Sequence, residues 1–174
     1  MLFLGVAACS DAGSRPPLES SPPQAYRLGA GDRIAVNVYG EQSIAGEYEV
    51  DDGGNVSLPL AGRVSVNKMT PAEAEQALQA KLKSSLENPQ VNVSVVEYRS
   101  VYILGEVAKP GAYPYRAGAT VLNAVALAGG YTYRAQTKGI SVMRPGDSDK
   151  DTKVAQQNSY LQPGDIVIVP ARWF

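Results

Sequence analysis

The sequence predicts an α+β protein built from two small domains, and three observations point to this class. Short stretches in which apolar and polar residues alternate, the pattern of half-buried strands, recur in both halves of the chain. Each half also holds one helical stretch that opens on a capping threonine. The 17 glycines and 12 prolines indicate many turns, and a length of 174 residues allows one domain or two small ones.

The composition excludes several classes of function. The net charge is −1, and no run of lysine and arginine with interleaved aromatic residues occurs, which argues against a nucleic-acid-binding protein. The chain has no histidine, so it lacks the commonest general base and zinc ligand, and a Ser-His-Asp triad is impossible. The single cysteine excludes an internal disulfide. We therefore expect no catalytic residue, no metal and no cofactor.

Residues 1–9, MLFLGVAAC, resemble the end of a signal peptide because they are apolar or small throughout. The stretch VAAC resembles a bacterial lipobox, in which the cysteine receives a lipid and becomes the mature N-terminus, so Cys9 is the candidate lipidation site. A buried free cysteine in a core strand is the other interpretation. It is weaker, because residues 10–25, with four prolines and four serines, predict a tether and not a core. In an extended polyproline conformation this tether reaches at most ~50 Å.

The first half, residues 26–98, predicts strand, hairpin, helix and strand. Ile34, Val36 and Val38 alternate with polar residues as one strand. The next stretch, 47–66, is interpreted as two strands around the turn 52–55.

The helix of the first half begins at Thr70, which is followed by proline and by Glu73, the signature of a capping box. Apolar residues follow at four-residue spacing: Ala74, Leu78, Leu82 and Leu86. The dipeptide at 88–89 ends the helix, and the stretch QVNVSVVEY predicts another alternating strand.

The second half, residues 99–174, repeats this order. The stretch 101–115 predicts two strands around the turn 109–111. Thr120 caps a short helix, VLNAVALA, which has no charged residue and is therefore expected to be buried on most sides. A strand follows near 138–146, and the last strand, Ile166 to Val169, is continuous in apolar residues and predicted to be buried on both faces.

One internal repeat joins the halves. Residues 28–36 and 161–169 share the pattern L-x-x-G-D-x-[IV]-x-V, with Gly31 and Asp32 matching Gly164 and Asp165. A shared turn that leads into a strand explains the pattern, because glycine adopts the unusual dihedral and aspartate caps the turn. A catalytic aspartate pair is rejected, since neither aspartate has a histidine or a metal-ligand cluster beside it.

The two halves together resemble a known pair of domains. The stretches ILGEVAKPGAYPY and TVLNAVALAGGYT resemble the soluble-ligand-binding β-grasp (SLBB) domain. The first half, with YRLGAGDRIAVNVYG and the TPAEAEQAL helix, resembles the polysaccharide export domain. With the lipobox, the chain is similar to Wza-type outer-membrane polysaccharide export lipoproteins. The marks of the β-grasp motif are Gly105, Glu106, Pro110, Gly111, Gly129 and Gly130.

This resemblance implies a structural part of an export machine for capsular or extracellular polysaccharide, not an enzyme. Members of the family form periplasmic rings, often eightfold, around an aqueous passage, and they dock onto an inner-membrane polysaccharide co-polymerase that is commonly linked to a tyrosine kinase. The expected location is the outer membrane, held by lipid and facing the periplasm.

The sequence departs from the large family members at its end. Those members add β-grasp domains and an amphipathic helix that crosses the outer membrane, whereas here ARWF follows the last strand directly. We therefore expect a short member, with either a separate outer-membrane partner such as a β-barrel or a ring confined to the periplasm. Trp173 and Phe174 would contact a bilayer or partner, or pack on the domain edge; both interpretations stay open.

The sequence leaves two other functions open. A periplasmic module that binds a glycan or another small ligand is the alternative, with sugar rings stacking on Tyr113, Tyr115, Tyr131 or Tyr133. A carboxylate-based glycan hydrolase using Glu106 with Asp32 or Asp165 has less support, because that chemistry requires a set separation of two carboxylates.

Overall fold

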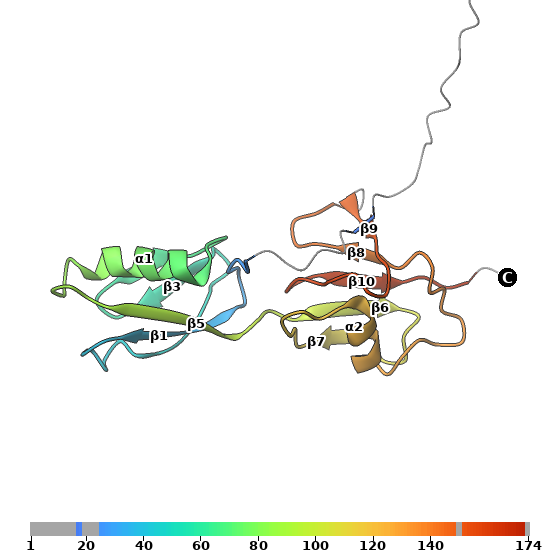
Figure 1. The fold of residues 1–174 in the computed structure, drawn as a ribbon, viewed down its shortest axis with the longest axis horizontal. Coiled ribbons are helices and arrows are strands. Elements are labelled where there is room, and N and C mark those ends of the chain that lie inside the picture. Colours follow the sequence, from blue (N-terminus) through green and yellow to red (C-terminus); the bar gives the residue numbers. More distant parts are fainter. Residues whose placement is uncertain (1–16, 19–24, 149–150, 173–174) are drawn as a thin grey trace, which may run out of the picture.

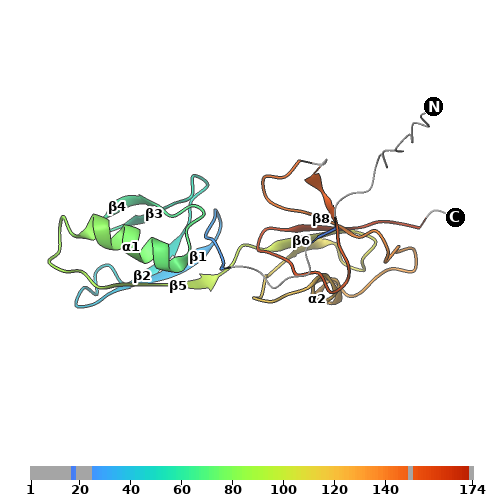
Figure 2. The ribbon, with the colours of Figure 1, turned by 45° about the horizontal axis from the view of Figure 1, so that its top comes forward.

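A computed structural model of the chain describes residues 17–18, 25–148 and 151–172. Two lobes lie end to end, the first drawn in blue to green and the second in yellow to red (Figures 1 and 2). Each lobe has its own hydrophobic core, one built from residues between Leu28 and Val93 and the other from Leu18 and residues between Val101 and Val169. The α+β class and the order of the two domains predicted from the sequence are confirmed.

The first domain is a three-stranded antiparallel sheet covered by a helix and a hairpin. The sheet order is β2-β1-β5, and its alternating valines and isoleucine face the core as predicted. Helix α1 packs on β5, and its buried residues are Ala74, Leu78 and Leu82. The elements are β1 (Arg33–Val38), β2 (Gly46–Glu49), β3 (Asn55–Leu58), β4 (Gly62–Ser65), α1 (Pro71–Leu82) and β5 (Val91–Glu97).

The capping box of α1 is formed as the sequence predicts. Glu73 donates its backbone N–H to the Thr70 hydroxyl at 3.2 Å, and the Glu73 carboxylate accepts the Thr70 N–H at 2.7 Å. Two N–H groups that would otherwise lack a partner are satisfied, which fixes where the helix starts.

The stretch 47–66 differs from its prediction. It contains three strands and not two, and the strands on either side of the turn 52–55 do not pair with each other. Strand β2 pairs with β1, whereas β3 pairs with β4. The Asp51 carboxylate accepts the Asn55 N–H at 2.8 Å and Gly54 takes a φ of 74°, so the turn directs the chain from one sheet into a separate hairpin.

The second domain is a five-stranded mixed sheet with one helix on one face. The order is β7-β6-β10-β8-β9, so β10, the last strand, lies between β6 and β8 and runs parallel to β6. The elements are β6 (Val101–Gly105), β7 (Gly111–Tyr113), α2 (Val121–Leu127), β8 (Ser141–Met143), β9 (Lys153–Val154) and β10 (Ile166–Val169).

The last strand is buried on one face only. Val167 and Val169 lie in the core, whereas Ile166 and Ile168 are half-buried on the opposite face. Their paired neighbours on β6, Tyr102 and Leu104, are 47% and 44% exposed. The sheet therefore presents an apolar outer face, defined here as these two residues of β6 with Ile166 and Ile168.

Helix α2 is also more exposed than predicted. Val121, Ala124 and Val125 pack into the core, but Leu122 and Leu127 are 49% and 55% exposed, so the expectation of burial on most sides is wrong. The lack of charge does not reflect burial, because the helix is the outer layer of this domain and nothing in the described residues covers its outer side. Leu122 and Leu127 are called the outer face of α2 below.

Part of the predicted tether joins the second domain. Leu18 is buried in that core, its N–H donates to the Val154 carbonyl at 2.7 Å, and Pro17 forms a bridge to the same residue. This short segment extends the sheet at β9, although the sequence around it predicts a solvated linker. Cys9, residues 10–16 and 19–24, Trp173 and Phe174 lie outside the described residues.

Candidate functional site

The two L-x-x-G-D turns have the same geometry. Gly31 and Gly164 have φ values of 85° and 87°. The Asp32 carboxylate accepts the Gly29 N–H at 2.8 Å, and the Asp165 carboxylate accepts the Gln162 N–H at 2.7 Å. The repeat is therefore a turn that leads into β1 and into β10, as the sequence analysis favoured.

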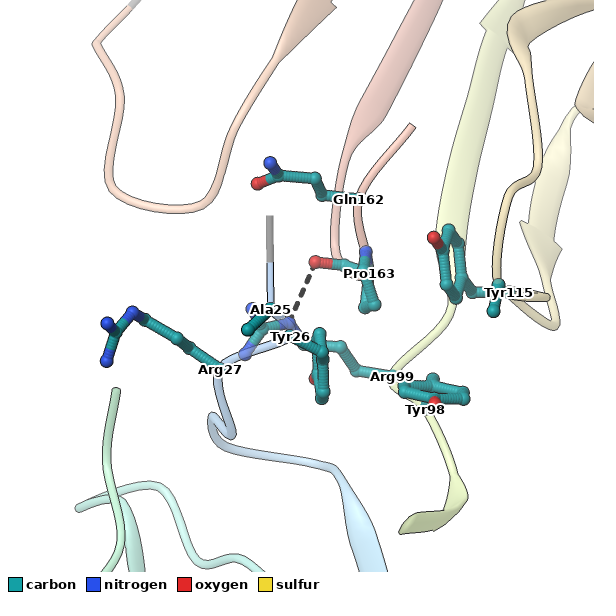
Figure 3. A pocket seen from close by; sticks show the side chains of 9 residues that line it. Ala25, Tyr26, Arg27, Tyr98, Arg99, Tyr115, Gln162 and Pro163 are labelled. Carbon is teal, nitrogen blue, oxygen red and sulfur yellow. Dashed lines mark hydrogen bonds between the residues drawn. The ribbon is translucent and has the colours of Figure 1, made fainter. Parts of the chain in front are cut away.

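Both turns meet at Arg99, in the connector between the domains. A Cβ on Gly29 would fall 1.7 Å from Nη1 of Arg99, and a Cβ on Gly164 would fall 2.9 Å from its Nε. Glycine at both positions therefore makes room for this side chain. Nε of Arg99 donates to the Pro163 carbonyl at 2.9 Å, so a residue of the connector is tied to the last turn of the second domain (Figure 3).

Asp32 holds the first domain to the connector. One carboxylate oxygen accepts the Arg99 N–H at 2.9 Å, and the other accepts from the Tyr26 hydroxyl as well as from Gly29. Burial, followed by this hydrogen bond to Asp32, raises the pKa of Tyr26 well above its usual value. The hydroxyl therefore stays protonated and remains a donor.

Asp165 differs from Asp32 in its partners. It is fully buried, and its Oδ1 has no hydrogen-bond partner. Burial raises the pKa of this carboxyl to about 6, against the hydrogen bond from Gln162 and the attraction of Arg144 and Arg99. Both aspartates are buried, but both oxygens of Asp32 accept hydrogen bonds whereas Oδ1 of Asp165 accepts none, so the charge of Asp165 is the costlier one to bury.

The glycine motif of the second domain joins three segments. Gly105, at the end of β6, has a φ of 87°, and a Cβ there would fall 2.1 Å from the Val169 carbonyl oxygen. The next residue, Glu106, donates its N–H to that same carbonyl at 2.9 Å. Ala108 and Lys109 then donate to the carbonyls of Gly130 and Ala128 at 3.0 and 2.9 Å. The two residues that follow the motif G-E-V therefore bond the motif A-G-G and hold the end of α2 to the end of the sheet.

The other motif residues have structural surroundings. The Glu106 carboxylate accepts a hydrogen bond from the Thr132 hydroxyl at 2.6 Å. Thr132 is not among the hydrogen-bond partners given above for Asp32 and Asp165. Pro110 and Gly111 form the turn into β7, and Gly129 and Gly130 end α2 with φ values of 83° and 90°. The proposed hydrolase pair of Glu106 with Asp32 or Asp165 gains no support from these contacts.

The tyrosines named in the sequence analysis do not gather at one place. Tyr113 donates to the Lys109 carbonyl at 2.6 Å, Tyr131 packs against the second core, and Tyr133 is exposed in a loop. Tyr115 instead meets two tyrosines that the sequence analysis did not select. Tyr98 makes edge-to-face contacts with Tyr26 and Tyr115, at centroid distances of 4.8 and 5.5 Å.

A cavity of about 440 Å³ opens beside these three rings, where the domains meet (Figure 3). Its lining comes from both domains and the connector: Ala25, Tyr26, Arg27, Tyr98, Arg99, Tyr115, Ala117, Gln162 and Pro163. No sequence signal identified this cavity, because its residues lie at domain edges and belong to no single motif. Within the described ranges, no group of three or more acidic or cysteine side chains is arranged to hold a metal ion.

Comparison with known protein families decides the relationship. Residues 20–96 match the family of polysaccharide biosynthesis/export proteins, and residues 100–155 match the SLBB domain. The chain carries a polysaccharide export domain followed by an SLBB domain. The resemblance inferred from the sequence is thereby confirmed for both domains and their order.

Curated relatives of the chain carry names from the same field. It is 35% identical over 112 residues to the exopolysaccharide production protein ExoF of Rhizobium meliloti, covering 57% of this chain and 27% of that one. It is 36% identical over 92 residues to the EPS I polysaccharide export outer membrane protein EpsA of Ralstonia solanacearum, covering 52% and 24%. It is 32% identical over 101 residues to the polysialic acid transport protein KpsD of Escherichia coli, covering 56% and 18%.

The aligned region spans about a quarter or less of the length of these relatives. Among the described residues of the chain, no helix has the length and apolar character needed to cross a membrane.

Proposed function

We propose that the chain is a lipid-anchored, periplasm-facing component of an outer-membrane polysaccharide export machine, and that it works as a subunit of a ring around the path of the polymer. The observation that carries this proposal is the succession of an export domain and an SLBB domain in one chain. The name of EpsA, an EPS I polysaccharide export outer membrane protein, points to the same role and location, and that of KpsD, a polysialic acid transport protein, points to the same role.

Two apolar surfaces of the second domain support assembly of several copies. The outer face of α2 lies on the helix side of the sheet, and Tyr102 and Leu104 lie on the opposite side. Because the surfaces are on opposite sides of one domain, contact between them joins copies head to tail. Such contacts form a closed ring when the rotation from one copy to the next divides a full turn evenly. A ring with this cyclic symmetry encloses a central passage.

Lipidation of Cys9 would place the second domain toward the membrane. Leu18 and Pro17 hold the N-terminal segment on β9, so only residues 10–16 separate Cys9 from that domain. At ~3.1 Å per residue those residues reach roughly 20 Å. The first domain would then point into the periplasm, toward an inner-membrane co-polymerase and its tyrosine kinase, with polysaccharide as the cargo and no catalytic role for this chain.

Deletion of the gene tests the export function. The expected result is loss of surface polysaccharide with accumulation of polymer inside the cell envelope, restored by the wild-type gene. In the deletion strain, the Cys9→Ser variant should be absent from the membrane fraction and should restore less surface polysaccharide than the wild-type protein does. Normal surface polysaccharide in the deletion strain would contradict the proposal.

Native mass spectrometry of the purified lipidated protein, alone or with its co-polymerase, tests the ring. A single defined subunit number is expected. A monomer under all conditions that saturates with a small glycan would contradict the ring and favour the alternative function, a periplasmic lipoprotein that binds a glycan or another small ligand.

A further inference from the structure

We propose that the cavity between the domains is a binding site for one or two sugar units of the transported polysaccharide. This inference rests on the proposed export function, which supplies a sugar polymer as the cargo. The cavity volume of about 440 Å³ lies within the range of sites that hold small molecules. Its walls come from both domains, and sites between domains are a common place for ligands.

The aromatic part of the wall is held rigid before any ligand arrives. Tyr98 is fixed between Tyr26 and Tyr115 by two edge-to-face contacts, with interplanar angles of 81° and 76°. The Tyr26 hydroxyl is held by Asp32. Rings that are already ordered lose little conformational freedom on binding, and their surfaces suit the C–H face of a sugar ring.

The polar part of the wall consists of planar groups that bind hydroxyls. Arg27, Arg99 and Gln162 line the cavity; a guanidinium carries five N–H donors in one plane, and an amide carries two N–H donors and one acceptor. Vicinal hydroxyls of a sugar match this spacing. Figure 3 shows the Arg27 side chain pointing away from Tyr98 and Tyr115, and its Nη1 donates to the Lys68 carbonyl at 2.7 Å, so Arg99 and Gln162 are the groups placed to bind hydroxyls.

The charges around the cavity favour a sugar over a small anion. The two guanidinium groups of the wall are balanced by Asp32, which is bonded to the Arg99 N–H, and by Asp165, whose carboxyl is attracted to Arg99. Arg27 is in addition paired with Glu73 at 3.3 Å on the surface. With no strong net field, recognition depends on hydroxyls and ring faces.

The test is an NMR titration of the full chain with a tetrasaccharide fraction prepared by partial acid hydrolysis of the cell's own surface polysaccharide. We expect saturable shifts of the backbone amides of Tyr98, Ala117 and Gln162. Polyethylene glycol of the same mass should cause none. Absence of saturable shifts, or shifts confined to other surfaces, overturns the proposal.

Two variants make the test specific. Ala117 is exposed at the mouth of the cavity, so Ala117→Arg adds bulk there without removing a contact of the fold, and Gln162→Ala removes one polar group. Gln162→Ala should weaken binding about tenfold, the loss of roughly one good hydrogen bond, and Ala117→Arg should weaken it at least as much because its side chain fills the mouth of the cavity. Ala45→Arg, at an exposed alanine of the first domain, is the matched control and should bind as wild type does. Equal binding by Ala117→Arg and wild type overturns the site.

Failure of this site is distinguishable from failure of the export function. If deletion abolishes surface polysaccharide but the purified chain binds no tetrasaccharide, the cavity proposal is wrong and the export function stands. If deletion leaves export unchanged, the export function is wrong whatever the titration shows.

Discussion

At the scale of single residues, the most constrained position is Gly105. Its φ of 87° lies in the region that favours glycine, and the Val169 carbonyl occupies the place where a Cβ would lie. Backbone, not a flexible side chain, blocks that place, so a substitution forces β6 and β10 apart. The glycine in the G-E-V motif is thus explained by close approach of two parallel strands.

Gly105→Ala should lower the free energy of unfolding by about 2–4 kcal/mol, because it combines backbone strain with a clash in the sheet. The control is Gly118→Ala, in the same domain, where φ is 80° but nothing lies within 4 Å of the added Cβ. That variant has the backbone strain without the clash, so it should lower the free energy of unfolding by about 1 kcal/mol. Calorimetric melting of both variants measures the difference; equal losses would show that the close approach to Val169 is relieved at no cost.

Asp165 makes stability depend on pH. Its folded pKa of about 6 exceeds the ordinary value of 3.8, so between these values the folded state binds more protons than the unfolded state. Stability therefore falls as pH rises from about 4 to about 6, by up to about 3 kcal/mol. Asp165→Asn keeps an acceptor for Gln162 and should be more stable than wild type at pH 7.5. The difference should shrink toward pH 4.

Urea unfolding of both proteins across this pH range tests the prediction. Asp51→Asn is a suitable control, because hydrogen bonds from Asn55 lower the pKa of this exposed carboxyl, the opposite direction. If Asp165→Asn lost stability at pH 7.5, attraction by Arg144 and Arg99 would outweigh the cost of burial.

At the scale of elements, α2 and the sheet expose surfaces that suit a neighbour. A head-to-tail contact requires Leu122 of one copy near Tyr102 of the next. With Cys9 replaced by serine, the double variant Leu122→Cys/Tyr102→Cys should therefore give a ladder of products with a short bis-maleimide. A mixture of the two single variants should stop at dimers, and each single variant alone should give none.

The outcome of that cross-linking separates two geometries. Efficient dimers from Leu122→Cys alone would show that α2 meets α2 across a two-fold axis, which closes after two copies. The pair Leu60→Cys/Tyr39→Cys, at two exposed apolar residues of the first domain, controls for collisions in solution.

Sequence reasoning worked for elements whose signal is local. The capping box fixed the start of α1, and alternation identified β1 and β5, because each pattern depends on neighbours in the chain. It failed where partners are distant. Strand β3 pairs with β4 and not with β2, and α2 is exposed on its outer side. Both features depend on contacts between elements distant in the sequence, which no local pattern of residues can predict. The cavity was missed for the same reason, since Tyr26, Tyr98 and Tyr115 are joined only by the fold.

At the scale of the whole molecule, Arg99 is the main described tie between the two domains. It bonds Asp32 through its backbone and Pro163 through its side chain, and it lies against glycines of both turns. A residue with partners on both sides restrains the relative orientation of the two domains.

Arg99→Ala should leave each core intact and loosen the link between them, because it removes the bond to Pro163 and opens space between the two turns. Small-angle X-ray scattering should show a broader distribution of intramolecular distances than for wild type. Arg63→Ala, which removes an exposed ion pair of 3.8 Å with Asp51, should scatter as wild type does. Identical scattering by Arg99→Ala and wild type would contradict this role.

The position of β10 in the sheet has a consequence for the order of events during synthesis. Residues 166–169 fill the slot between β6 and β8, and no earlier segment of the described chain occupies it. Until residues 166–169 have been synthesised, the sheet of the second domain consists of two separate pairs of strands, β7-β6 and β8-β9, with no strand between them. The first domain has all of its strands by residue 97. Its nascent form can therefore fold while the second domain waits for residues 166–169, and the long-range parallel pairing makes that later step the slower one.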